Sequence, residues 1–395
     1  DVLGSRGLGD VYKRQMYNIA DTWVVGRYLG SDALAAVGSS YTLMTFLTSI
    51  IIGLCMGSGA AISMQYGSGD SKKMRQSVFI SFCLIAGISI ALNIIVYIGM
   101  DFILWALQIP NEIQAMMRDY LEIIFLGITA TFLYNYFANL LRAIGNSVLP
   151  LVFLAVSAVL NVVLDLVCVL LFNWGVKGAA IATVFSEFIS AIGIAIYTFK
   201  RFKQLIPEKE DMKWNRNNLS AILNLSVMTS LQQSIMNFGI LMVQGLVNSF
   251  GTVIMAAFAA AVKIDSFAYM PVQDFGNAFS TYVAQNYGAG KQERIRKGIK
   301  SAFVTSVIFC AIISLLVIVF AKPLMCIFIN PDETEIISAG VIYLCIEGSC
   351  YIGIGILFLL YGYYRAVNKP FMSVVLTVIS VSYTHLRAHE TLRHL

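Results

Sequence analysis

Long apolar runs, each of about 20 residues, recur along nearly the whole chain and are separated by short polar connections. As helices, such runs cross a bilayer and satisfy their backbone polar groups internally, so the pattern predicts an all-α polytopic membrane protein. The short alternating segments of a transmembrane β-barrel are not seen. The expected segments are 16–30, 36–66, 77–107, 116–141, 149–172, 176–199, 219–249, 253–287, 298–320 and 338–364, with an eleventh from Phe371.

Composition supports this fold class. The chain of 395 residues is 58% hydrophobic and 12% charged, whereas a soluble domain carries about twice that charged fraction. The seven cysteines are scattered through apolar runs without a CxxC pair, so we interpret them as small packing residues.

Basic residues are concentrated in every second connection between the apolar segments. Seventeen lysines and arginines lie in one set of connections, and only Arg27, Arg118, Lys177 and Lys322 lie in the other. Because cytoplasmic loops of membrane proteins are enriched in lysine and arginine, the richer set is expected in the cytoplasm. This predicts a cytoplasmic N-terminus. As a separate hypothesis we expect the chain in the inner (plasma) membrane of a prokaryote.

The two halves of the chain are related by an internal repeat. AAVGSS at Ala35 aligns with AAFAAA at Ala256, and YGSG at Tyr66 aligns with YGAG at Tyr287, both at an offset of 221 (256 against 35, 287 against 66). A tandem duplication of a six-helix unit follows, and an even number of spans gives both copies the same orientation, a parallel repeat. The first segment is too short to span and the last is cut, so about ten and a half of twelve spans are present.

Both ends of the chain look foreign to the apolar sequence between them. SRGLGDVYKRQ (5–15) and VSYTHLRAHET (381–391) lack helical periodicity, and back-translation of both yields one DNA sequence on opposite strands, similar to a sequencing-transposon adaptor. We therefore expect 1–15 and 381–395 to be adaptor-derived and non-native. All three histidines lie in this tail, which leaves histidine chemistry out of the remaining chain.

The expected domains follow from the repeat and the ends. They are an N-terminal lobe at 16–200 with helices 1–6, helix 1 truncated, a cytoplasmic linker at 201–218, and a C-terminal lobe at 219–380 with helices 7–11, helix 11 truncated and helix 12 absent.

Several stretches together carry a family resemblance. They are DTWVVGRYLGSDALAAVG from Asp21, the YGSG and QNYGAG turns, LLRAIGNSVLP from Leu140, LNVVLD from Leu160 and GVKGAAIAT from Gly175. In their order, spacing and duplication they resemble the multidrug and toxic compound extrusion (MATE) family of secondary antiporters. The resemblance implies two six-helix lobes around a central cavity that opens alternately to either side. It also implies a transporter rather than an enzyme, with no cofactor beyond a coupling ion, H⁺ or Na⁺.

Four residues are candidates for ion coupling. Asp165 interrupts the apolar run Leu160–Phe172, and Asp21 interrupts an earlier one; intramembrane carboxylates mark ion or substrate pathways by default. Asn161 lies four residues before Asp165 and so shares its helix face. Asp21, Asp165 and Thr183 lie at a common depth of roughly 10–14 Å from the segment ends, at about 1.5 Å per residue.

The resemblance assigns the coupling cation to the same four residues, as matching a first-helix Asp, a fifth-helix Asp and Asn, and a sixth-helix Thr. Converging oxygens suit a proton shared between carboxylates or a hard cation, so Na⁺ is a candidate metal at Asp21, Asn161, Asp165 and Thr183. The alternative is that each aspartate only hydrogen-bonds a neighbouring helix, and that the Asn and Thr only pack.

Other polar residues in apolar runs are weaker candidates for the cavity or the substrate: Asp274, Gln232, Gln233 and Glu187. Lys263 and Asp265 are two residues apart and do not share a helix face, which favours a structural role. The sequence does not assign Glu347. The seventh segment lacks a carboxylate, so the acidic C-lobe site of another branch of the family is not evident.

The sequence thus leads us to expect a monomeric efflux antiporter. Influx of H⁺ or Na⁺ would drive export of small amphipathic, cationic drugs or metabolites from the bilayer or cytoplasm by alternating access, with no nucleic-acid partner. The alternative is a flippase or exporter of lipid-linked or polysaccharide precursors, which would want a basic cavity; Lys263 is the intramembrane lysine available for one. A membrane-embedded enzyme would need a histidine or acidic metal cluster.

Overall fold

The computed structural model describes the backbone of residues 28, 31–106, 111–248, 250 and 252–393. Throughout these residues regular structure is helical and no strand occurs, which confirms the all-α class. Seven of the described helices are long and apolar enough to cross a membrane, or eight when the bent pair of α5 and α6 counts as one span. The chain divides into two compact units, one ending at Ser234 and one beginning at Ile235.

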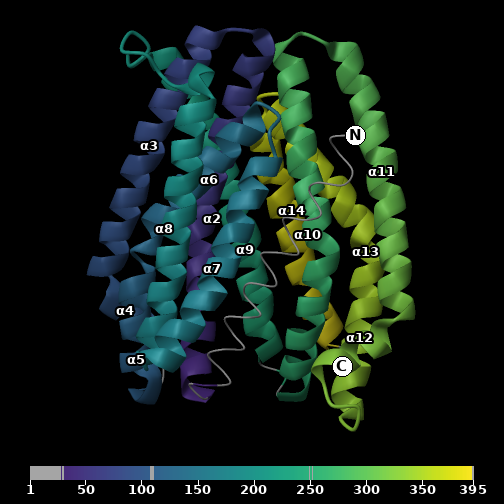
Figure 1. Ribbon diagram of the computed structural model, residues 1–395. Coiled ribbons are helices and arrows are strands. Elements are labelled where there is room, and N and C mark those ends of the chain that lie inside the picture. Colours follow the sequence, from purple (N-terminus) through teal and green to yellow (C-terminus); the bar gives the residue numbers. More distant parts are fainter. Residues whose placement is uncertain (1–27, 29–30, 107–110, 249, 251, 394–395) are drawn as a thin grey trace. The chain divides into compact units, whose positions relative to one another are not determined.

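The helices of the first unit (Figure 1) correspond to the expected segments from 36–66 onward, with ends that differ by up to six residues and short breaks inside two of them. The expected segment 16–30 lies outside the described residues except for Tyr28. They are α2 (Ser31–Ser68), α3 (Ser71–Ile98), α4 (Met100–Ala106), α5 (Asn111–Ile124), α6 (Gly127–Ala143), α7 (Val148–Leu166), the π turn η1 (Val167–Leu171), α8 (Gly175–Arg201), the 3₁₀ turn η2 (Lys203–Leu205) and the first part of α9 (Arg216–Asn248).

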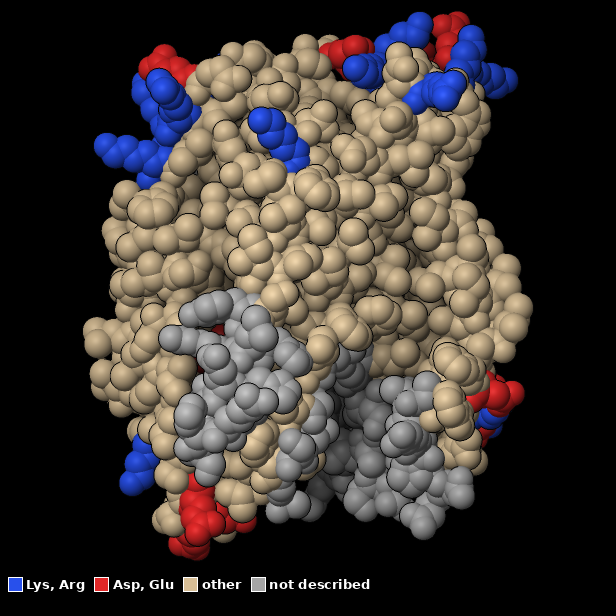
Figure 2. Space-filling model, turned by 180° about the vertical axis from the view of Figure 1, so that it is seen from behind, with Lys and Arg blue, Asp and Glu red and all other residues tan. Residues whose placement is uncertain are grey.

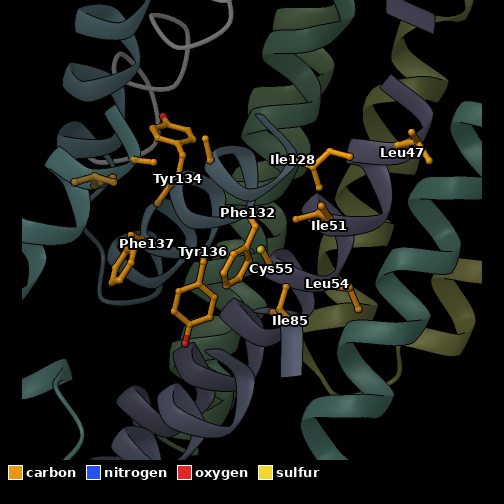
Figure 3. Close-up of a cluster of buried hydrophobic side chains, with 14 of the residues drawn as sticks. Leu47, Ile51, Leu54, Cys55, Ile85, Ile128, Phe132, Tyr134, Tyr136 and Phe137 are labelled. Carbon is orange, nitrogen blue, oxygen red and sulfur yellow. The ribbon is translucent and has the colours of Figure 1, made fainter. Parts of the chain in front are cut away.

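The core of the first unit lies where α2, α3 and α6 meet (Figure 3). Phe132, Tyr136 and Phe137 of α6 pack in this cluster, and the Tyr136 hydroxyl donates to the Val78 carbonyl oxygen at 2.6 Å. Since lipid tails are as apolar as the core, close packing and satisfied polar groups hold membrane helices together. Gly57 of α2 serves this packing, because a Cβ there would lie 2.4 Å from the carbonyl oxygen of Leu225 in α9.

The linker of the first unit is held against α3. Arg75 Nε donates to Asp211 Oδ2 at 2.5 Å, and the Asp211 side chain is only 2% exposed. Nearby, Asn218 Oδ1 accepts from Ser77 Oγ at 2.9 Å and from Gln65 Nε2 at 3.2 Å. Side chains of the segment 201–218 are therefore bonded to α2 and α3 at defined positions.

The second unit holds α10 (Thr252–Gly288), α11 (Gln292–Val319), α12 (Ala321–Phe328), α13 (Thr334–Ala366) and α14 (Pro370–Arg393). Its tightest contact is between α10 and α13, where small residues let two backbones approach. A Cβ on Gly362 would lie 2.5 Å from the Gly276 carbonyl oxygen.

The duplication seen in the sequence is present in the backbone. α3 and α11 start and end 221 residues apart (71 and 292, 98 and 319), and α5–α6 and α13 do so at 223 (111 and 334, 143 and 366). Gly69 and Gly290 end α2 and α10 with positive φ values of 77° and 69°, a conformation that suits glycine after a helix.

One feature breaks the repeat. The predicted segment 116–141 is divided into α5 and α6, which meet at a bend of 41°, whereas α13 runs through without a break. Asn93 Nδ2 of α3 donates to the Phe125 carbonyl oxygen at 2.6 Å, which satisfies a backbone group at the break.

Most exposed charged side chains on the drawn face lie near helix ends (Figure 2). On the face that Figure 2 draws, the lysines, arginines, aspartates and glutamates leave a broad, almost uncharged band between the two ends. Such a band fits helices that cross a hydrocarbon layer.

Candidate functional site

The fifth predicted segment, now α7 and η1, is bonded to α8 by a ladder of polar contacts. Ser190 Oγ donates to the Phe153 carbonyl oxygen at 2.9 Å, and Ser157 Oγ donates to the Ser186 carbonyl oxygen at 3.1 Å. Phe153, Ser157 and Asn161 are spaced by four, so they follow one face of α7. This register fixes what Asn161 meets on α8.

Asn161 contacts both Asp165 and Thr183, so three of the four predicted coupling residues lie together. Its side-chain amide contacts Thr183 Oγ1 at 3.2 Å. With the amide oriented to satisfy both of its ends, Nδ2 donates to Asp165 Oδ2 at 3.0 Å and Oδ1 accepts from Thr183 at 3.2–3.3 Å. That orientation is favoured because a carboxylate accepts hydrogen bonds and cannot donate them. Asn161 and Asp165 are fully buried.

The helix carrying Asp165 changes geometry directly after it. At the π turn η1 the Phe172 N–H bonds the Val167 carbonyl oxygen, five residues back, at 3.1 Å. A Cβ on Gly178 would lie 3.2 Å from Cys168, so the glycine lets α8 approach this turn. π turns inside helices are frequent at functional sites.

Asp21, the fourth predicted residue, lies outside the described residues. The expected meeting of Asp21 and Asp165 therefore stays a prediction.

The weaker candidates lie in several places. Gln232 is buried in α9, and Gln233 Nε2 lies 4.0 Å from the Met56 sulfur of α2. Glu187 projects from α8 toward α6. Asp274 is half-buried on α10 of the second unit.

In the second unit Asp265, for which the sequence favours a structural role, is paired with a tyrosine that the sequence does not single out. The Tyr351 hydroxyl of α13 donates to Asp265 Oδ1 of α10 at 2.6 Å, and Asp265 is only 9% exposed. Glu347 lies one turn before Tyr351 and so on the same face of α13. The spacing of Glu347 and Tyr351 is visible in the sequence, but the pairing of Tyr351 with Asp265 depends on the contact between α13 and α10.

The Asn161–Asp165–Thr183 group brings three kinds of polar side chain together. It gathers a carboxylate, an amide oxygen and a hydroxyl in an apolar bundle, and burying a lone carboxylate there is costly. A proton on the carboxyl group or a hard cation held by the three oxygens would remove that cost. Among the described residues no group of three His, Cys, Asp or Glu side chains forms a metal site.

Comparison with known proteins agrees with this fold. The MatE family model matches residues 14–167 and 226–387. The chain is 31% identical over 375 residues to "Probable multidrug resistance protein YpnP" of Bacillus subtilis, covering 94% of this chain and 83% of that protein. It is 24% identical over 376 residues to the "FAD transporter" of Shewanella oneidensis, covering 92% and 80%.

Solved structures share the fold. The bent form of the Vibrio cholerae MATE transporter VcmN superposes with a TM-score of 0.86 at 24% identity, covering 95% of this chain and 85% of that one. The family match over most of the chain, the multidrug resistance relative and the apolar helices together show that this chain belongs to the multidrug and toxic compound extrusion (MATE) family of multi-pass membrane transporters and is not an enzyme.

Proposed function

We propose that this protein is a cation-coupled antiporter in which inward flow of H⁺ or Na⁺ drives export of amphipathic, cationic compounds by alternating access. The observation that carries the proposal is the fully buried Asp165, bonded through Asn161 to Thr183 on the next helix. Three oxygen-bearing side chains from two helices meet in an apolar bundle. The free-energy cost of burying them there depends on whether an ion is bound.

The coupling follows from that dependence. With an ion bound, the carboxyl group is neutralised and α7 and α8 keep their packed arrangement; without it, an arrangement that admits water to Asp165 is favoured. The ion shifts the balance only by the difference in its affinity for the two arrangements. Asp21 completes the proposed site, and Na⁺ remains the candidate metal there.

The names of the relatives bear on the substrate class. Several relatives are named for multidrug resistance or export, and one is named as a transporter of FAD, which is anionic. Asp274, Gln232 and Gln233 remain candidates for contacts with substrate or cavity. We propose a prokaryotic inner-membrane location with a cytoplasmic N-terminus, from the distribution of basic residues, and a monomeric state.

The test is transport by the purified protein in liposomes. Efflux of an ethidium-like cationic dye is followed under an imposed pH gradient and, separately, an imposed sodium gradient. We expect one gradient to drive efflux, and D165N to reduce efflux to the level of protein-free liposomes while its elution on size exclusion is unchanged.

Asp101→Asn is the matched control, since it removes the same charge from an 83% exposed aspartate on α4. D101N should transport like the parent. Gradient-driven dye efflux that persists in D165N would contradict the coupling role. Efflux of FAD or a polyprenyl-linked sugar, with no dye efflux, would favour the alternative of an exporter for anionic precursors.

A further inference from the structure

Glu187 lies at the middle of α8 and faces α6 in the first unit. Thr131 Oγ1 of α6 donates to Glu187 Oε2 at 3.3 Å. A Cβ on Gly127 would lie only 3.2 Å from the same oxygen. The first two turns of α6 thus supply both a donor and the space for this carboxylate. α8 is long and apolar enough to cross a membrane, and so is the bent pair of α5 and α6.

A row of polar side chains continues along α6 from this point. Asn135 Nδ2 bonds the Thr131 carbonyl oxygen and Asn139 Nδ2 bonds the Asn135 carbonyl oxygen, each at 2.8 Å. Because Gly127, Thr131, Asn135 and Asn139 are spaced by four, they follow one face of α6 toward its C-terminal end. We call these four residues the α6 polar row.

The second unit shows that the fold does not need this row. At the offset of 223, the residues of α13 that correspond to Thr131, Asn135 and Asn139 are Ile354, Phe358 and Gly362. The break between α5 and α6 is likewise missing from α13. The same helix architecture therefore forms with apolar residues, and polar groups at membrane depth that packing does not require are functional candidates. Broken helices beside such groups recur at the ion sites of transporters.

The α6 polar row is connected to the Asp165 group through α8. Thr183, which contacts Asn161, lies one helical turn before Glu187 and on the same side of α8. Asn161 in turn bonds Asp165. Polar side chains thus continue from Asn139 of α6, past Glu187, to Asp165 of α7.

We propose that Glu187 is a second ion-coupling carboxylate: it takes up the transported cation from the α6 polar row and passes it across Thr183 to the Asp165 group. For a proton, the step moves H⁺ from the Glu187 carboxyl group to the Asp165 carboxylate and changes no other bond. This inference rests on the proposed antiport.

The experiment compares two modes of dye movement in liposomes: efflux driven by the ion gradient, and exchange of labelled for unlabelled dye without any gradient. A coupling carboxylate is needed for the first mode, whereas loss of the fold removes both. We expect E187Q to abolish gradient-driven efflux and to keep the exchange rate of the parent. E187D, which restores a carboxylate, should recover part of the driven efflux.

The matched control is Glu122→Gln, since Glu122 is an exposed glutamate on α5. E122Q should keep both modes. T131V, which removes the hydroxyl donor to Glu187 and keeps its charge, should weaken driven efflux and leave exchange unchanged.

Two results would overturn the inference. One is driven efflux by E187Q equal to that of E122Q. The other is loss of exchange together with driven efflux in E187Q, E187D and T131V alike, which would indicate a structural role. D165N in the same assay tests the proposed antiport separately, because driven efflux retained by D165N contradicts that proposal whatever E187Q does.

Discussion

The ion pair between Arg75 and Asp211 holds the linker that follows α8 against the start of α3, and removing it should release that linker. Asp211 is 2% exposed and Arg75 is 22% exposed, with 2.5 Å between Nε and Oδ2. The Glu208 N–H also donates to Asp211 Oδ2, at 3.2 Å. D211A removes both contacts and leaves a guanidinium group that can reach water.

The magnitude follows from this partial exposure. Breaking a fully buried ion pair costs about 3–5 kcal/mol, and an exposed pair is worth about 0–1 kcal/mol. Because Arg75 keeps contact with water, we expect about 2 kcal/mol for D211A, between the two limits. At about 1.4 kcal/mol per factor of ten, the open population of the linker rises about 25-fold.

Limited trypsin digestion of the purified protein measures that population, since Lys203, Lys209 and Lys213 lie in the linker. When opening and closing are fast relative to cleavage, the cleavage rate follows the open fraction. D211A and R75A should each raise the rate of linker cleavage about 25-fold. Because both variants remove the same interaction, the double variant should be cleaved at nearly the same rate as either single variant. E208Q is the control, because Glu208 is 71% exposed and 3.9 Å from Arg75. Unchanged cleavage in D211A, or additive effects in the double variant, would refute the reasoning.

Three further predictions rest on other contacts. The hydrogen bond from Arg75 lowers the pKa of Asp211. The stability that the ionised Asp211 gives the linker is therefore present above the unfolded-state pKa of about 3.9 and is lost as pH falls through the lower pKa of the folded state. Hydrogen exchange of linker amides, corrected for its intrinsic pH dependence, should rise over that pH range in the parent and stay flat in D211N. Y351F removes the donor to Asp265 and should destabilise the second unit by about 1–3 kcal/mol, seen as a lower thermal midpoint; an unchanged midpoint would count against that bond. G57A forces a Cβ against α9 and should lower the thermal midpoint, whereas G87A, with open space around it, should leave it unchanged or slightly higher; equal effects would contradict the close packing.

The sequence by itself determined the helices and their repetition. Apolar runs long enough to cross a bilayer form helices there, so the bounds of α8, expected at 176–199 and found at Gly175–Arg201, could be predicted to within a few residues. The starts of α3 and α11 lie six residues before the expected ones, because polar residues continue these helices beyond the apolar runs. Gly69 and Gly290 could be recognised as turn residues because each lies three residues after a tyrosine, in YGSG and YGAG, at matching positions of the repeat. The shared face of Asn161 and Asp165 also follows from local geometry, since a spacing of four is one helical turn.

The tertiary structure decided which polar groups meet. A membrane helix that is apolar on all sides gives little sign of its rotation about its axis, and the register between helices is set by packing of small residues. For that reason the pairing of Asp265 with Tyr351, the contact of Glu187 with Thr131 and the break before Gly127 could not be predicted from hydropathy. From the sequence, the proximity of Thr183 to Asn161 follows only from the family resemblance and from the common depth of Thr183 and Asp165. In the structure, the serine hydrogen bonds between α7 and α8 set the register that brings the two residues together.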